Sequence, residues 1–206
     1  MNIKLFNIGG KVKPLAREFK TPKYKRRLAY LESTGTQWID AKHPSSPCVV
    51  PFEIGVFGLD TKWFCGGGTS STLGFGVCHK ELPRDTTTSI GFGWDKTINY
   101  WNRVYVKPYY TVGVVMAGSI YLYAYNNVGG NGVTSGSYQE SFVLFGRRVG
   151  EIIETSKARI FFQIYGDQKL IPVMDFNDVP CMFDEVSGQF FYNQGTGRFL
   201  YGELEG

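Results

Sequence analysis

The acidic residues that lie close together in the chain include three candidates for paired carboxylates: Glu151 with Glu154, Asp175 with Asp178, and Asp184 with Glu185. Two carboxyl groups about 5 to 5.5 Å apart can hydrolyse a glycosidic bond with retention of configuration, and a strand presents such groups on one face two or four residues apart. None of the pairs has that spacing, and we expect the first pair in a loop and the last in a tight turn. The acidic residues therefore predict no hydrolytic site.

The residues that most often serve as nucleophiles, general bases or zinc ligands are few and scattered: His43, His79, Cys48, Cys65, Cys78 and Cys181. Neither histidine has the spacing of a triad or of a metal motif. A structural zinc site usually takes four ligands in close pairs, and no C-x-x-C pair is present. We therefore predict no enzyme, no cofactor and no metal, and we expect reduced, packed thiols.

One segment combines aromatic rings with polar groups that could bind sugar. Residues 91–103, "GFGWDKTINYWNR", supply the carbohydrate-binding candidates Trp94, Asp95, Asn99, Tyr100 and Trp101. Sugars stack on exposed aromatic faces and form hydrogen bonds with Asp and Asn at the ends of strands. The alternative is that both tryptophans belong to the core or its rim, since large aromatic side chains are mostly buried.

Positive charge is concentrated at the N-terminus. Residues 1–27 contain nine Lys and Arg against the single acid Glu18, a net charge of +8, whereas the remaining residues contain 13 basic and 17 acidic side chains, a net charge of −4. Pro14 and Pro22 favour an extended backbone over a helix. An extended segment that mixes apolar and basic residues suits docking onto a partner. The docking candidates are Ile3, Leu5, Phe6, Ile8, Lys11, Lys13 and Arg17.

Two alternatives for this segment stay open. Chain ends are often flexible and serve only solubility. A basic segment can also bind nucleic acid through its phosphates, in a salt-dependent manner. We rank nucleic-acid binding lower, because the segment has few interleaved aromatic residues and the rest of the chain is acidic.

The remaining residues, 28–206, predict a single all-β domain. Short runs rich in β-branched and aromatic residues recur between turn residues, over 49–59, 89–94, 98–110, 109–117, 119–127, 140–149 and 158–166. The glycine-rich stretches 65–74 and 126–132 are expected at loop apices. Helical signals are poor: only residues 148–158 could form a turn or two of helix, and a loop is the alternative there. Many short strands without a repeat favour a two-sheet antiparallel jelly-roll sandwich behind an extended N-terminal arm.

Both ends of this domain carry a resemblance. "LAYLESTGTQWIDA" (28–41) and "ARIFFQIYGDQKLIPVMDFNDVPCMFDEVSGQFFYNQGTGRFLYG" (158–202) resemble the first strand and the closing hairpins of concanavalin A-like, laminin-G-like jelly-roll domains of gut bacteria and their phages. The resemblance covers about a third of the domain directly. Two features depart from the pattern: the loop in "YGDQKLIPV" is shortened, and the basic segment in front is extra. From the residues alone, the aromatic positions and turns of both motifs are expected to determine the fold.

The resemblance implies a bacterial or phage setting. Together with the basic segment, it leads us to expect a non-enzymatic virion protein, such as a head decoration, head fibre or tail-associated protein, that docks on other virion proteins through residues 1–27. The alternative is a glycan-binding, lectin-like module that contacts a host-surface glycan. The sequence shows no secretory signal and no membrane span, so we expect synthesis in the host cytoplasm and incorporation into the virion in multiple copies.

Overall fold

The computed structural model describes residues 23–45, 52–60, 62–70, 73–79, 87–92, 100–105, 110–114, 120–124, 127–132 and 138–204. Within these ranges all regular structure is β-strand, and the prediction of an all-β fold is confirmed. Among these residues there is no helix that could cross a membrane.

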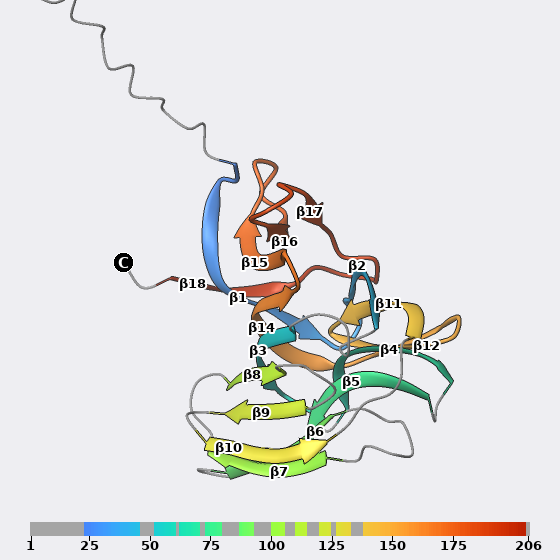
Figure 1. The fold of residues 1–206 in the computed structure, drawn as a ribbon. Coiled ribbons are helices and arrows are strands. Elements are labelled where there is room, and N and C mark those ends of the chain that lie inside the picture. The colour runs from blue at the N-terminus through green and yellow to red at the C-terminus, as the bar shows by residue number, and fades with distance from the viewer. Residues whose placement is uncertain are drawn as a thin grey trace, which may run out of the picture.

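The first sheet has ten strands, which run in the order β10-β9-β8-β3-β14-β1-β15-β16-β17, with β18 paired to β1. Their bounds are β1 (Arg26–Thr34), β3 (Phe52–Gly58), β8 (Tyr110–Val114), β9 (Ile120–Ala124), β10 (Asn127–Gly132), β14 (Lys157–Tyr165), β15 (Gln168–Met174), β16 (Pro180–Asp184), β17 (Phe190–Phe191) and β18 (Leu200–Glu203). In Figure 1, β1 runs beside β15 at one end and crosses toward β14 at the other.

The second sheet has eight strands, in the order β13-β12-β4-β5-β6-β7, and β11 joins β2 to β4. Their bounds are β2 (Ile39–Ser45), β4 (Trp63–Ser70), β5 (Leu73–His79), β6 (Thr87–Phe92), β7 (Tyr100–Tyr105), β11 (Tyr138–Leu144), β12 (Gly146–Val149) and β13 (Ile152–Thr155). Strand β12 pairs with β4 in parallel, and the other described pairs are antiparallel.

The two sheets share one hydrophobic core, as the layers of a sandwich do. Leu31, Ile54 and Ile160 contribute from the first sheet, and Ile39 and Phe142 from the second; all of these side chains are buried. Each large apolar side chain that is buried in this way stabilises the folded state by about 1.5 to 3 kcal/mol, relative to leaving it exposed. The described members of this cluster all lie between Leu28 and Phe199. The jelly-roll order of the strands stays a prediction.

The turn in "ESTGTQW" moves the chain from one sheet to the other. The motif at 28–41 therefore forms two strands, β1 in the first sheet and β2 in the second. The side-chain oxygen Oε1 of Gln37 accepts hydrogen bonds from the Thr34 backbone N–H (2.8 Å) and from the Ser33 hydroxyl (3.2 Å). This amide oxygen satisfies the Thr34 N–H and the Ser33 hydroxyl where the chain leaves the first sheet, and Gln37 is itself buried.

Three local predictions were wrong. Residues 127–132 form β10, paired with β9, and residues 65–68 lie within β4, although both glycine-rich stretches were expected in loops. Pairing with neighbouring strands overrides the low strand propensity of glycine. Residues 148–158 contain the hairpin of β12 and β13, with Gly150 at a φ of 56° in its turn, so Glu154 lies in a strand and not in a loop.

Candidate functional site

Most of the residues that the sequence singled out lie outside the described ranges. Trp94, Asp95 and Asn99 fall between β6 and β7, and all of the docking candidates from Ile3 to Arg17 precede residue 23. Tyr100 and Trp101 begin β7, where their backbones pair with Phe92 and Gly91 of β6. Carbohydrate binding by 91–103 and docking by 1–27 stay predictions.

The last residues of the basic segment belong to the sandwich. Strand β1 begins at Arg26, which pairs with Met174 of β15, and the Lys25 backbone N–H donates to the Met174 carbonyl (2.9 Å). The Tyr24 ring packs edge-on against Phe183, with centroids 5.2 Å apart. Tyr24 and Phe190 cover a second buried cluster, made of Ile171, Val173, Cys181 and Phe183.

Two charges of this segment are paired with the body. The Lys25 ammonium lies 2.6 Å from a carboxylate oxygen of Asp178, and the Arg26 guanidinium lies 3.0 Å from that of Glu203. The hydrogen bond from Lys25 lowers the pKa of Asp178. Residues 24–27 of the basic segment are therefore held by the body.

The two motifs that carry the family resemblance contact each other. The Asn193 side-chain oxygen accepts from the backbone N–H of Trp38 (3.1 Å) and of Gly195 (2.9 Å). The Gln194 N–H donates to the Trp38 carbonyl (2.8 Å), and the Thr196 N–H donates to the Thr36 carbonyl (3.2 Å). The "NQGTG" loop therefore closes over the turn between β1 and β2. That these motifs determine the fold stays a prediction.

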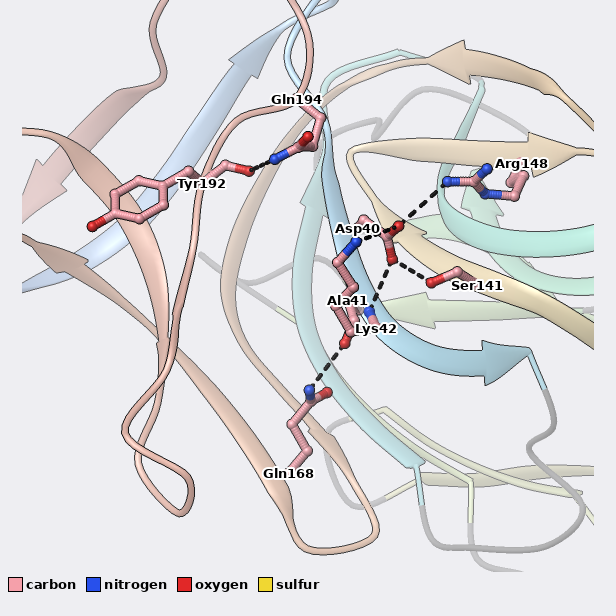
Figure 2. Close-up of polar contacts among 8 residues, drawn as sticks. All are labelled: Asp40, Ala41, Lys42, Ser141, Arg148, Gln168, Tyr192 and Gln194. Atoms are coloured by element: carbon pink, nitrogen blue, oxygen red, sulfur yellow. Dashed lines mark hydrogen bonds and ion pairs between the residues drawn. The ribbon is translucent and has the colours of Figure 1, made fainter.

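Asp40 is the centre of a polar cluster between β2, β11 and β12, drawn in Figure 2. Its carboxylate accepts from the Ser141 hydroxyl, from the Lys42 backbone N–H (2.9 Å) and from the Lys42 ammonium (3.1 Å). The Arg148 guanidinium lies 3.5 Å away. Burial raises the pKa of Asp40, but these hydrogen bonds outweigh it, and the pKa lies below its usual value. The carboxylate is ionised at neutral pH and joins three strands.

His43 lies close to this cluster but is not arranged for catalysis with Ser141. Its ring stacks on Tyr165 (centroids 3.8 Å apart) and is 8% exposed. Nδ1 lies 3.0 Å from the Pro44 carbonyl, which can only accept, so Nδ1 carries the proton. Nε2, 2.6 Å from Nε2 of Gln163, then accepts from that amide. Burial lowers the pKa of His43 to about 4, so the ring is neutral and both nitrogens are engaged.

The acidic pairs found in the sequence hold turns or form ion pairs. Asp184 accepts from the backbone N–H groups of Lys169, Val186 and Ser187, and Asp175 accepts from those of Asn177 and Val179. Asp175 also accepts from the Tyr192 hydroxyl (3.1 Å); burial and this hydrogen bond raise the pKa of Tyr192 to about 12. Carboxylates used in this way stabilise local turns.

Successive arginines of β12 each lie over a tryptophan. The Arg148 guanidinium carbon lies 5.8 Å from the ring centroid of Trp38, and that of Arg147 lies 5.5 Å from the ring centroid of Trp63. Neighbouring residues of a strand point to opposite faces, so the two pairs flank β12. Cation–π contacts of this kind contribute about 0.5 to 2 kcal/mol.

A pocket of about 430 Å³ lies beside the Arg147–Trp63 pair. It is lined by Lys62, Trp63, Glu154 and Thr155. The Arg147 Nε lies 2.6 Å from a carboxylate oxygen of Glu154, so this arginine connects the tryptophan to the acid. Sequence reasoning missed the site because its two sides, "TKWF" and "RRVGEIIET", are distant in the chain.

Among the described residues no group of three or more His, Cys, Asp or Glu could hold a metal ion. Cys65 and Cys181 are buried thiols that form no disulfide, as predicted, and burial raises the pKa of Cys181 to about 12. Comparisons with protein-family models, with curated proteins and with solved structures find no match for this chain.

Proposed function

We propose that the protein is a non-enzymatic structural and adhesion component of a phage virion. It docks on other virion proteins through its N-terminal segment and displays a jelly-roll sandwich outward. The observation that supports the proposal is that the main cluster of the described core uses residues from Leu28 onward, after the basic segment. Lys25 and Arg26, at the end of that segment, are held by the body.

In this proposal the apolar and basic residues upstream of residue 23 contact the partner. Lys25 and Arg26, at the end of the segment, have acidic partners within the body. A partner with an acidic, partly apolar surface would complement the rest of the segment. The resemblance to domains of gut bacteria and phages supplies the virion setting, and an adhesive role suits a domain that is displayed in many copies.

The polar groups of the body support a non-catalytic role. Ser141 donates to Asp40, a carboxylate whose lowered pKa makes it a weak base. Both nitrogens of His43 are engaged with Gln163 and Pro44, so this histidine is not available to activate the hydroxyl. Asp175 and Asp184 are occupied by backbone N–H groups of their own turns.

Deletion of residues 1–22 tests the proposal. This boundary keeps Tyr24, Lys25 and Arg26, so we expect a body with unchanged circular dichroism and unchanged melting. Virions produced in cells that express the shortened chain should not contain it, whereas virions produced in cells that express the full chain should contain that chain. Mass spectrometry of purified particles measures the difference. A matched variant that replaces Lys4, Lys11, Lys13 and Arg17 with Gln separates charge from apolar contact. Normal incorporation of the shortened chain would refute docking through this segment, and absence of the full chain from virions would refute the virion role.

A further inference from the structure

The pocket beside Trp63 combines three kinds of group that a saccharide requires. Trp63 is half-buried and offers the surface of a flat indole ring. Glu154 offers a carboxylate whose side chain is 50% exposed, and Lys62 offers an ammonium group at the exposed side. The volume of about 430 Å³ lies near the lower end of the range for small-ligand pockets and suits one or two sugar rings.

The positions of these groups are fixed by the surrounding strands. Arg147 binds Glu154 through Nε and lies over Trp63, and only 15% of its side chain is exposed. Arg147 and Glu154 are also direct partners in the β12–β13 ladder. The Thr155 hydroxyl donates to the Gly35 carbonyl (2.5 Å), which ties the pocket wall to the turn that follows β1. A site held in this way loses little entropy when a ligand binds.

The charge of the pocket favours an anionic ligand. Arg147 neutralises Glu154, but the Lys62 ammonium has no hydrogen-bond or ion-pair partner within the described part of the chain. A charged donor at the mouth of a pocket forms strong hydrogen bonds with a carboxylate. One oxygen of Glu154 binds Arg147, and the other can accept from sugar hydroxyls. A nucleic acid is a less suitable ligand, because the Glu154 carboxylate and the net negative charge of residues 28–206 would repel its many phosphates.

We infer that the pocket lined by Lys62, Trp63, Glu154 and Thr155 binds an acidic saccharide, a pyranose that carries a carboxylate. The carboxylate is held by Lys62, the ring lies against Trp63, and a hydroxyl donates to Glu154. This site lies apart from residues 91–103, and the inference does not depend on attachment through residues 1–22.

Calorimetric titration of the full chain tests the site directly. The probes are oligosaccharides that contain glucuronic or sialic acid, and their carboxyl-reduced forms serve as matched neutral controls. We expect the acidic forms to bind more tightly. Lys62→Gln, at an exposed lysine that should not affect folding, is expected to weaken binding of the acidic form about tenfold and to leave the reduced form unchanged. Trp63→Phe is expected to weaken both forms.

Lys169→Gln is the control for charge, since Lys169 is an exposed lysine of β15 in the first sheet, paired with Glu185. It should bind like the unaltered chain. The inference is overturned if no acidic saccharide binds at millimolar concentration, or if Lys62→Gln and Lys169→Gln weaken binding equally. It is also overturned if Trp101→Ala abolishes binding while Lys62→Gln leaves it intact, or if a single-stranded oligonucleotide displaces the saccharide.

Discussion

The side-chain oxygen of Asn193 accepts a hydrogen bond from the backbone N–H of Trp38, which precedes it by 155 residues. Asn193 also donates to the carbonyl of Gly197 (2.9 Å), so a single amide joins the start of β2 to the loop before β18. We therefore expect Asn193→Ala to lower the free energy of unfolding by about 1 to 3 kcal/mol, because it leaves these backbone groups without partners. Urea denaturation measures the change. Asn193→Asp keeps the acceptor and should cost less; an equal loss would contradict this role.

Gly195 lies where a side chain does not fit. A Cβ at this position would overlap the Thr36 carbonyl oxygen and lie 2.9 Å from Cδ1 of Trp38. Gly195→Ala should therefore lower the free energy of unfolding by about 1 to 3 kcal/mol. Gly188→Ala is the control, because Gly188 has a φ of 76° but no neighbour within 4 Å, so only backbone strain remains. Melting temperatures of the two variants give the comparison, and a larger loss for Gly188→Ala would be inconsistent with steric closure at Thr36.

Because His43 is buried in its neutral form, we expect the free energy of unfolding to fall in mild acid. The pKa is about 4 in the folded protein and about 6.5 in the unfolded chain, so both forms are neutral above pH 6.5. Between pH 6.5 and 4 the unfolded chain binds the proton first, and the free energy of unfolding falls by roughly 3 kcal/mol. Urea midpoints at pH 7, 5.5 and 4 follow this change.

The variant His43→Phe isolates this effect. It keeps a ring against Tyr165 but removes the ionisable group, so its stability should be lower at pH 7 and depend less on pH between 6.5 and 4. An unchanged dependence on pH in this variant would assign the loss to other groups. Asp40 and Asp184 have lowered pKa values, so their contribution is lost at more acidic pH.

Cys181 should be inert while the protein is folded. Burial, followed by the nearby Asp175 carboxylate, raises the pKa of its thiol to about 12, so almost no thiolate exists at neutral pH. We expect no alkylation by iodoacetamide at Cys181 in native protein and full alkylation in urea, measured on the tryptic peptide. Cys65, also buried, should behave in the same way. Rapid native labelling of Cys181 would show that β16 opens locally.

Carbohydrate binding by residues 91–103 is a separate prediction. If Trp94 and Trp101 bind sugar, a glycan array should show binding that Trp101→Ala abolishes, without a change in melting temperature. Binding that survives this substitution would direct attention to the Trp63 pocket, where Lys62→Gln is the deciding variant.

Strand composition and turn residues were sufficient to predict the class of fold. The strand propensity of "ARIFFQIYG" and the turn propensity of "DEVSGQFF" depend only on residues that are adjacent in the chain. Both form as expected: the first is β14, and the second is the turn after β16 that Asp184 holds. The excess of charge at the N-terminus is likewise a property of the sequence alone. The exact end of that segment is not, because Tyr24 and Lys25 are fixed by Phe183 and Asp178, more than 150 residues later.

Only the tertiary structure decided which side chains meet. The glycine-rich stretches at 65–68 and 127–132 are strands because partner strands satisfy their backbone groups, an effect that no local propensity contains. In the same way, Trp63 meets Arg147 and Glu154 because β4 and β13 both lie beside β12. Hydrogen-bonded ladders bring distant segments together. The sequence therefore determined the strands rich in β-branched and aromatic residues, and the ladders determined the glycine-rich strands and the pocket.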